Sequence, residues 1–337
     1  MNIKEALNKV IDKVDLTKEE MVSVMTQIME GRVADSQLGA LLTALRMKGE
    51  SVSEIVGAAL VMRDKAERLK VRADTIVDTC GTGGDGADTF NISTAAAFVV
   101  AGSGITVAKH GNRAVSSRSG SADVLRCLGV NIEAEKATVE KCIDDVGIGF
   151  LFAPLMHGAM KHASGVRKEL GMRTIFNLLG PLTNPAGAHS QVIGIYDPGR
   201  LEQIANVLKQ LDSRHAFVVH GCDGLDEITL TGETKVCELV KGEIKEYLLR
   251  PESFGLKACK SEDLVGGSPE ENAEILKHIL SGKKGPQRDI VLVNSSVAII
   301  AGGRADNLEE AIIIARQAID DGSAEKKLND LCKASRA

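Results

Sequence analysis

The 337 residues are enough for one large domain and a smaller companion, because single hydrophobic cores usually stop growing at about 250 to 300 residues. No apolar run reaches the length of about 18 residues that can span a bilayer, and the sequence begins without the basic start and apolar core of a secretory signal, so we expect a cytoplasmic protein and no membrane partner. A net charge of −5 and the absence of Trp disfavour nucleic-acid binding as the main activity.

Residues 1 to about 65 have the pattern of helices only. Capping boxes at Thr17–Glu20 and Ser51–Glu54 each open an apolar-periodic segment, and glycines at 31 and 49 separate the helices. Four short helices rich in Leu, Met and Val cannot bury all their apolar faces in so small a unit. We therefore expect part of this surface to meet the larger domain or a second subunit.

From Thr75 onward, short β-branched runs are followed by glycines and then by helical patterns, which predicts a parallel sheet covered by helices. The predicted strands are 75–79, 105–108, 191–195 and 216–219, with an antiparallel hairpin of 236–240 and 244–247. Two long helices, 288–301 and 307–320, are expected to close the domain.

The predicted fold class is α/β, with a small all-helical domain and a large domain that has a mainly parallel central sheet. We place the helical domain at residues 1–70 and the α/β domain at 71–337. Residues of about 154–186 show a helical pattern without a strand signal, so we expect them to leave the sheet and join the N-terminal helices.

The first segment with chemical character is Gly81-Thr-Gly-Gly-Asp-Gly86, between a predicted strand and the helix that Asn91-Ile-Ser-Thr94 can start. Glycines let the backbone approach a ligand, and free N–H groups at a helix start favour an anion, which indicates phosphate binding. A strand-to-helix turn that merely needs glycine is the alternative. The segment also matches G-x-G-x-x-G, but a dinucleotide site expects an acidic residue about 20 positions later, where Lys109–Arg113 stands instead.

Two further loops complete the charge pattern. Lys109–Ser121 is dense in cations, hydroxyls and glycines, which suits phosphate groups. Asp226 and Glu227 follow another predicted strand, and such carboxylates bind Mg²⁺ together with substrate phosphates. A solvated basic loop and a solvated acidic turn are the alternatives.

The sequence resembles the anthranilate phosphoribosyltransferase family over essentially its whole length. The matching motifs are Gly81–Asp85, Asn91–Thr94, Lys109–Arg113, Ser119–Asp123, Gly165–Arg167, Asn177–Pro185 and Asp223–Glu227. The resemblance implies transfer of ribose 5-phosphate from phosphoribosyl pyrophosphate to the amine of anthranilate, in tryptophan biosynthesis. It also implies two Mg²⁺ ions in each active site and a homodimer formed through the helical domain.

The resemblance carries specific roles onto this chain. The residues implied for phosphoribosyl pyrophosphate are Gly81, Gly84, Asp85, Thr89, Asn91, Ile92, Ser93, Thr94, Lys109, His110, Gly111, Asn112, Arg113, Ala114, Val115, Ser116, Ser117 and Ser121. Those implied for anthranilate are Gly81, His110, Asn112 and Arg167, with the Arg167 guanidinium meeting the carboxylate. Ser93, Asp226 and Glu227 are implied for magnesium, and no residue stands out as a general acid or base.

Two other functions compete with this interpretation. A pyrimidine nucleoside phosphorylase has a similar layout, but it would use inorganic phosphate and would not need the pair of carboxylates at 226 and 227. A nucleic-acid-binding relative that lost the chemistry is disfavoured by the acidic net charge.

Overall fold

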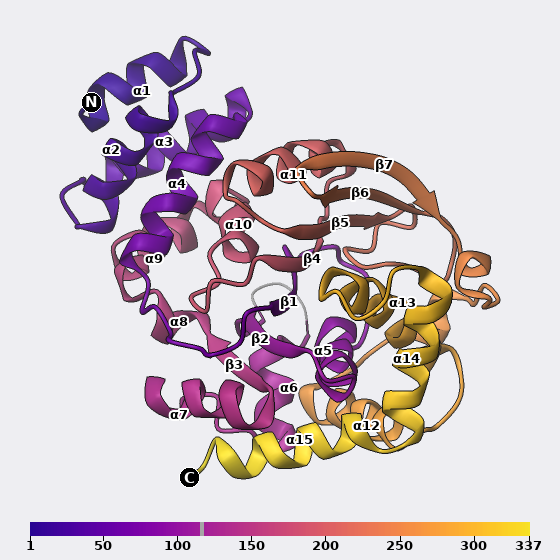
Figure 1. The fold of residues 1–337 in the computed structure, drawn as a ribbon. Coiled ribbons are helices and arrows are strands. Elements are labelled where there is room, and N and C mark those ends of the chain that lie inside the picture. The colour runs from indigo at the N-terminus through magenta and orange to yellow at the C-terminus, as the bar shows by residue number, and fades with distance from the viewer. Residues whose placement is uncertain (115–117) are drawn as a thin grey trace.

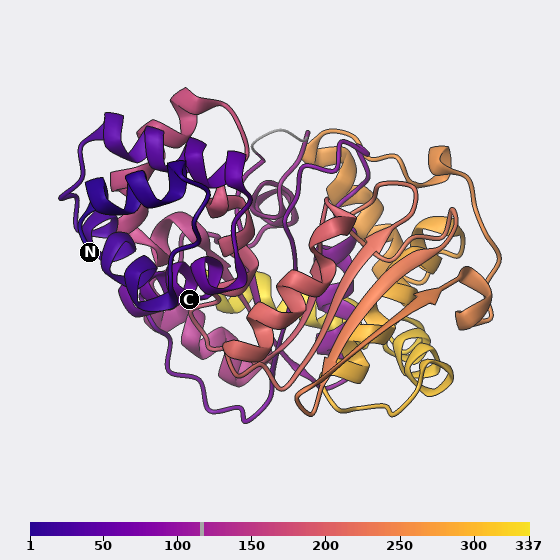
Figure 2. The ribbon, with the colours of Figure 1, turned by 90° about the horizontal axis from the view of Figure 1, so that it is seen from above.

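The computed structural model describes residues 1–114 and 118–337 and consists of an N-terminal helical bundle beside an α/β domain (Figures 1 and 2). This arrangement confirms the predicted fold class. Among the helices of the described residues, none combines the length and the apolar character that a membrane crossing requires.

The bundle contains four helices, two of which begin directly after the N-caps of the predicted capping boxes. They are α1 (Ile3–Ile11), α2 (Lys18–Met29), α3 (Asp35–Lys48) and α4 (Val52–Lys65). Both predicted capping boxes form, with Thr17 and Ser51 as the N-caps. Two later helices, α9 (Lys161–Leu170) and α10 (Ile175–Leu179), pack against α2, α3 and α4, so the bundle core is built from two stretches of chain that are distant in sequence.

The sheet contains seven strands within the described residues, in the order β3-β2-β1-β4-β5-β6-β7. Their bounds are β1 (Ile76–Gly81), β2 (Thr106–Gly111), β3 (Ile148–Phe152), β4 (Ser190–Gly194), β5 (His215–Gly221), β6 (Thr234–Val240) and β7 (Glu243–Leu249). The first five strands are parallel, and β6 and β7 form the predicted antiparallel hairpin at one end. The carboxyl ends of β1, β2 and β4 therefore meet at one edge of the sheet.

Alternate residues of the central strands enter different cores. In β4, for example, Val192 packs in the larger core and Ile193 in the core shared with the bundle, as the two-residue period of a strand requires. The larger core is covered by α5 (Ile92–Gly102), α6 (Ser121–Leu128), α12 (Pro269–Leu280), α13 (Pro286–Ala301), α14 (Leu308–Asp320) and α15 (Ser323–Ala334). The opposite face carries α11 (Leu201–Gln210), and α7 (Lys136–Lys141) and α8 (Ala153–Met156) lie near β3.

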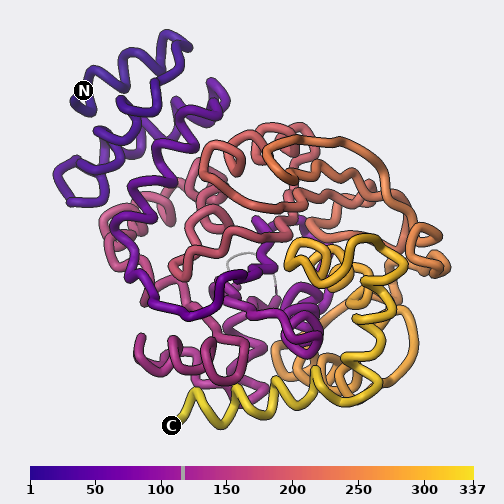
Figure 3. Tube along the Cα trace, in the orientation of Figure 1, coloured from indigo at the N-terminus to yellow at the C-terminus, as the bar shows by residue number. Residues whose placement is uncertain are grey.

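The main differences from the sequence-based expectation are strand β3 and the helices α12 and α15. The predicted strand set omits β3, whose five residues are all buried, so the run has no polar alternation to mark it. It also omits α12. The prediction that 288–301 and 307–320 close the domain is wrong, because α15 follows them and packs against α5; the tube in Figure 3 traces this last helix across the domain.

Polar contacts fasten the bundle to the α/β domain. Glu50, at the start of the α4 segment, is buried and forms an ion pair with Arg200 at 2.7 Å. Arg63 of α4 donates to the carbonyl oxygen of Leu182, beyond α10, at 2.7 Å. These contacts are made by charged groups with little access to water, so they fix the relative orientation of the two parts more firmly than surface pairs would.

Glu54 is the polar centre of the bundle, and its removal should destabilise the protein strongly. Its buried carboxylate accepts from the Leu16 N–H at 3.0 Å and the Ser51 N–H at 2.7 Å, and pairs with Lys48 at 2.9 Å. Glu54→Ala leaves two N–H groups without partners and removes one of the two carboxylates that pair with Lys48, whose other partner is Asp15 at 2.5 Å. We therefore expect unfolding to become easier by about 3 to 5 kcal/mol in urea titrations.

Glu20→Ala is the matched control, since Glu20 holds the same place in a capping box and also pairs with a lysine, Lys9, at 2.6 Å. Glu20 is partly exposed, so its loss should cost only about 1 kcal/mol. Equal losses in the two variants would contradict the central role of Glu54.

Candidate active site

The candidate site is built where three parallel strands end in glycine. Gly81, Gly111 and Gly194 are the last residues of β1, β2 and β4, and Gly81 is directly paired with Gly194 across the β1–β4 ladder. The glycine-rich loop of 81–86 and the basic loop from 109 thus start side by side at one sheet edge. This is the edge at which ligands bind in open parallel sheets.

Asp226 fits against the ends of β1 and β4 because both strands end in glycine there. A Cβ atom at Gly81 would lie 2.5 Å from Asp226 Oδ2, and one at Gly194 would overlap the Asp226 carbonyl oxygen. The same carboxylate oxygen, Asp226 Oδ2, accepts a hydrogen bond from the Gly83 N–H at 2.7 Å. The first predicted phosphate loop and the predicted metal loop are therefore in direct contact, and these glycines are required by packing whatever ligand they meet.

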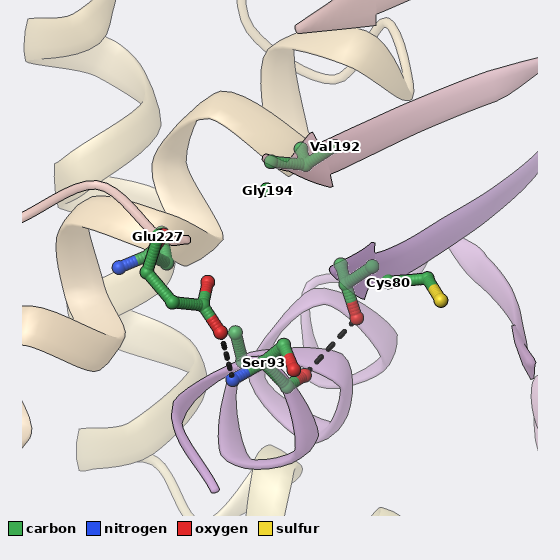
Figure 4. A pocket seen from close by; sticks show the side chains of 8 residues that line it. Cys80, Ser93, Val192, Gly194 and Glu227 are labelled. Carbon is green, nitrogen blue, oxygen red and sulfur yellow. Dashed lines mark hydrogen bonds between the residues drawn. The ribbon is translucent and has the colours of Figure 1, made fainter. Parts of the chain in front are cut away.

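Glu227 lies over the start of α5. The Ser93 N–H donates to Glu227 Oε1 at 3.1 Å (Figure 4). The Ser93 hydroxyl accepts from Lys109 Nζ at 3.4 Å. The buried Lys109 ammonium also donates to the carbonyl oxygen of Thr79. A small cavity of about 10 Å³, lined partly by these groups, lies between the ends of β1 and β4 and α5. Three segments of the predicted site thus converge on Ser93.

The electrostatics of this region favour a cation. Burial raises the pKa of Glu227 to about 7, with Asp85 adding to the rise and Lys109 opposing it. Burial, then Glu227 and then Asp85 raise the pKa of Asp226 well above its usual range. Three carboxylates against one partly shared ammonium leave an excess of negative charge that a divalent cation would offset.

The donor set fits magnesium in particular. Within residues 1–114 and 118–337, no group of three or more His, Cys, Asp or Glu side chains is arranged to hold a metal by itself. Magnesium prefers oxygen and commonly takes one or two carboxylates with phosphates and water completing its shell. Asp226, Glu227 and the Ser93 hydroxyl are oxygen donors of this kind.

The basic loop is held in shape by two networks. The Asn91 side chain donates to the Ser119 carbonyl at 3.0 Å, and its oxygen accepts from the Ser119 hydroxyl and from Asn272, each at 3.1 Å. The Asp123 carboxylate accepts from the N–H groups of residues 114 and 120 at 3.0 Å each, which draws the two ends of the loop together. The predicted ligands Val115, Ser116 and Ser117 lie outside the described residues.

His110 faces a second histidine that the sequence did not indicate. Its ring lies 5.1 Å from that of His157, and the Nε2 atoms of both have no hydrogen-bond partner in the described structure. Burial lowers the pKa of His110 to about 3 and that of His157 to about 4, so both rings are neutral. The Asp78 carboxylate accepts from the backbone N–H of His110 at 3.1 Å and from the side-chain amide of Asn184 at 2.8 Å.

Arg167 is not joined to these loops by any contact in the described residues. It lies on α9, partly buried, with its guanidinium 5.2 Å from the Phe176 ring centre. Arg173, which sequence analysis did not single out, crosses from the same segment: it stacks on Tyr196 at 3.7 Å and donates to the carbonyl oxygen of Gly84. The helical side therefore touches the glycine-rich loop through Arg173.

Other predicted ligands have packing or loop contacts. Ile92 and Thr94 are buried on α5, Thr89 bridges to Val265, and the Ser121 hydroxyl donates to the Asn112 carbonyl at 3.3 Å. Arg113 pairs with Glu133 at 3.1 Å, outside the carboxylate cluster. Besides Arg173 and His157, sequence analysis also missed Gly194; a glycine near the end of the predicted strand 191–195 was the only available signal.

The comparisons with known proteins cover both parts of the chain. Residues 4–66 match the glycosyl transferase family, helical bundle domain, and residues 73–325 match the a/b domain of the same family. An anthranilate phosphoribosyltransferase of Anaeromyxobacter sp. (strain K) is 55% identical over 333 residues, which cover 99% of this chain and 98% of the relative.

Two solved structures share the fold over nearly the whole length. The anthranilate phosphoribosyltransferase of Thermus thermophilus has a TM-score of 0.94 at 44% identity, covering 98% of this chain and 99% of that one. The Saccharomyces cerevisiae enzyme, solved in complex with PRPP and Mg, has a TM-score of 0.91 at 30% identity, covering 99% and 98%. The chain therefore belongs to the anthranilate phosphoribosyltransferases, the enzymes that transfer a phosphoribosyl group to anthranilate in tryptophan biosynthesis.

Proposed function

We propose that the phosphoribosyl transfer of this family takes place at the sheet edge where β1, β2 and β4 end. The observation that carries this proposal is the placement of the buried Asp226 and partly buried Glu227 carboxylates against the glycine-rich loop and the start of α5. Anionic phosphates would be repelled there unless magnesium lay between them and the carboxylates. We propose two Mg²⁺ ions per site, held by Asp226, Glu227 and Ser93.

Phosphoribosyl pyrophosphate would occupy the glycine-rich loop, the start of α5 and the basic loop. The proposed contacts are Gly81, Gly84, Asp85, Thr89, Asn91, Ile92, Ser93, Thr94, the segment from Lys109 to Ser117, and Ser121. Two kinds of support come from the fold. Gly83 and Gly84 have φ values of +67° and +78°, a backbone conformation that L side chains rarely adopt and that lets the loop approach a ligand closely. The N–H groups of the first turn of α5 add a positive end of a helix dipole.

Anthranilate would lie between α9 and the sheet edge. Arg167 would pair with its carboxylate, and Gly81, His110 and Asn112 would contact its ring or amine. The neutral state of His110 supports this assignment, because a neutral ring can lie against an aromatic amine without repelling the positive charge that develops on the sugar. Burial lowers the pKa of Arg167, so an anion that paired with it would recover the lost solvation.

The reaction breaks the bond from the anomeric carbon to the pyrophosphate oxygen and forms one to the amine nitrogen, which then loses a proton. When bound, magnesium supplies charge stabilisation for the departing pyrophosphate. Lys109 would add a fixed positive charge, while the two parts of the protein would hold the weakly nucleophilic amine in line with the bond that breaks. The protein thus acts by positioning and electrostatics, and we assign no general base.

Replacing Asp226 by Asn together with Glu227 by Gln should abolish magnesium-dependent turnover. The amides keep the shape of the side chains and remove both charges, so we expect kcat/KM to fall by more than about 100-fold in a fluorescence assay of anthranilate consumption. Glu233→Gln is the control, because Glu233 is an exposed carboxylate nearby in sequence that pairs with Arg250. Full activity in the double variant would exclude this metal site.

Replacing Arg167 by Ala should weaken anthranilate binding selectively. A charge-assisted contact is worth about 1.5 to 3 kcal/mol, so the KM for anthranilate should rise about 10- to 100-fold with little change in the KM for phosphoribosyl pyrophosphate. Lys168→Ala removes an exposed neighbouring charge and should leave both constants unchanged. A similar loss for both substrates would move Arg167 out of the acceptor site.

We also propose a homodimer through the helical bundle, in a cytoplasmic enzyme. Large apolar side chains are exposed on the bundle at Ile11, Val14, Met47 and Leu60, and Met47 reaches 81% exposure. Such groups in one small unit are typical of a surface that a second copy covers.

Light scattering after gel filtration tests the dimer. The mass should be twice the 35.7 kDa of one chain, and Met47→Glu with Leu60→Glu should reduce it to one chain mass. Ile313→Glu introduces a charge at another exposed apolar residue, on α14 and outside the bundle, and should leave the dimer intact. A single-chain mass for the unchanged protein would refute the proposal.

A further inference from the structure

Asn294 is a buried amide in the middle of α13 whose side chain bonds to another part of the chain. Its Oδ1 accepts from the Ile228 N–H at 2.9 Å, and its Nδ2 donates to the Ile228 carbonyl at 2.9 Å. The same Nδ2 donates to the Ile290 carbonyl of its own helix at 2.9 Å. The amide is thus fully used, and it holds both peptide groups of the residue that directly follows Glu227.

The neighbouring polar residues of α13 behave differently. Ser295 and Ser296 are also fully buried, but each hydroxyl donates only to the carbonyl four residues earlier in the same helix, at 2.7 Å. Asparagine is a weak helix former because its side chain competes for backbone groups. Its position in this helix therefore has an explanation in the loop that it binds, whereas the serines only complete the helix itself.

The loop that Asn294 holds is anchored at two points with the carboxylates between them. At its start, Asp223 accepts from the Leu225 N–H at 3.2 Å and from the Thr229 hydroxyl at 2.6 Å. At its end, Asn294 holds Ile228. Asp226 and Glu227 lie in between, and two like charges that close together push apart unless the backbone that carries them is fixed.

Asn294 is also close to the site itself. It lines the same small cavity as Glu227 and Ser93, the two residues joined by a dashed line in Figure 4. A side chain that does not touch the metal but orients its ligands through hydrogen bonds commonly lowers metal affinity by about 10- to 100-fold when it is removed.

We propose that Asn294 is a positioning residue that presents the Asp226 and Glu227 carboxylates to magnesium. This inference rests on the function proposed above. It assigns to α13, a helix that contributes no metal ligand, the task of holding the metal-binding loop at a fixed distance from Ser93 and the glycine-rich loop.

The test is a titration with Mn²⁺, a paramagnetic substitute for Mg²⁺, followed by electron paramagnetic resonance of the full-length protein with phosphoribosyl pyrophosphate and no anthranilate. Asn294→Ala should weaken Mn²⁺ binding about 10- to 100-fold. In the anthranilate assay the KM for magnesium should rise to a similar degree, with the KM for anthranilate unchanged. Asn294→Asp keeps the shape and the acceptor for the Ile228 N–H but, when ionised, loses the donor, so it provides a second variant if the alanine variant does not fold.

Ser295→Ala is the matched control, because it removes a buried hydroxyl one residue away and should leave Mn²⁺ binding unchanged. Folded Asn294 variants that bind Mn²⁺ within about twofold of the original protein would overturn the inference, as would an equal loss in the serine variant. The double Asp226→Asn, Glu227→Gln variant distinguishes a failure of the proposed metal site from a failure of the role assigned to Asn294. If it loses Mn²⁺ binding and the Asn294 variants do not, only this inference fails; if it retains binding, the metal site of the proposed function fails as well.

Discussion

The active-site edge depends on the approach of Asp226 to the ends of β1 and β4. The carboxylate and carbonyl of this residue occupy space that a side chain at Gly81 or Gly194 would fill. Because the contact is so close, the position of the acidic loop is determined by the ends of these two strands. The distance between the loop proposed for phosphate and the carboxylates proposed for magnesium then follows from strand register, and substrate binding does not have to create it.

Placing these carboxylates together is electrostatically unfavourable for the folded protein. Asp226, Glu227 and Asp85 repel one another, and burial disfavours the charged form of Asp226 and Glu227. In the absence of a cation, the opposing groups are the Lys109 ammonium and the N–H groups of Gly83 and Ser93. The same excess charge that destabilises the free site would strengthen the proposed magnesium binding.

Sequence reasoning located the features that have local signals and missed those that depend on tertiary contacts. Capping boxes, glycine-rich turns and the cluster of cations from Lys109 each have a residue pattern of their own, and the loops that they predict do meet at one edge. Strand β3 has no such pattern because both of its faces are buried. Gly194, His157 and Arg173 were not identified because their significance lies in which residue they face, and one sequence does not specify contacts between distant segments.

The acceptor side of the site shows how the two parts of the protein can act together. Arg167 and Arg173 are six positions apart on one segment of the helical side, yet only Arg173 reaches the glycine-rich loop, where it stacks on Tyr196 and donates to Gly84. A segment that carries the residue proposed for anthranilate is therefore already attached to the loop proposed for phosphoribosyl pyrophosphate. The Arg173 guanidinium thus joins the loop proposed for phosphoribosyl pyrophosphate to the stretch of chain that follows α9, through a planar group able to stack and donate at the same time.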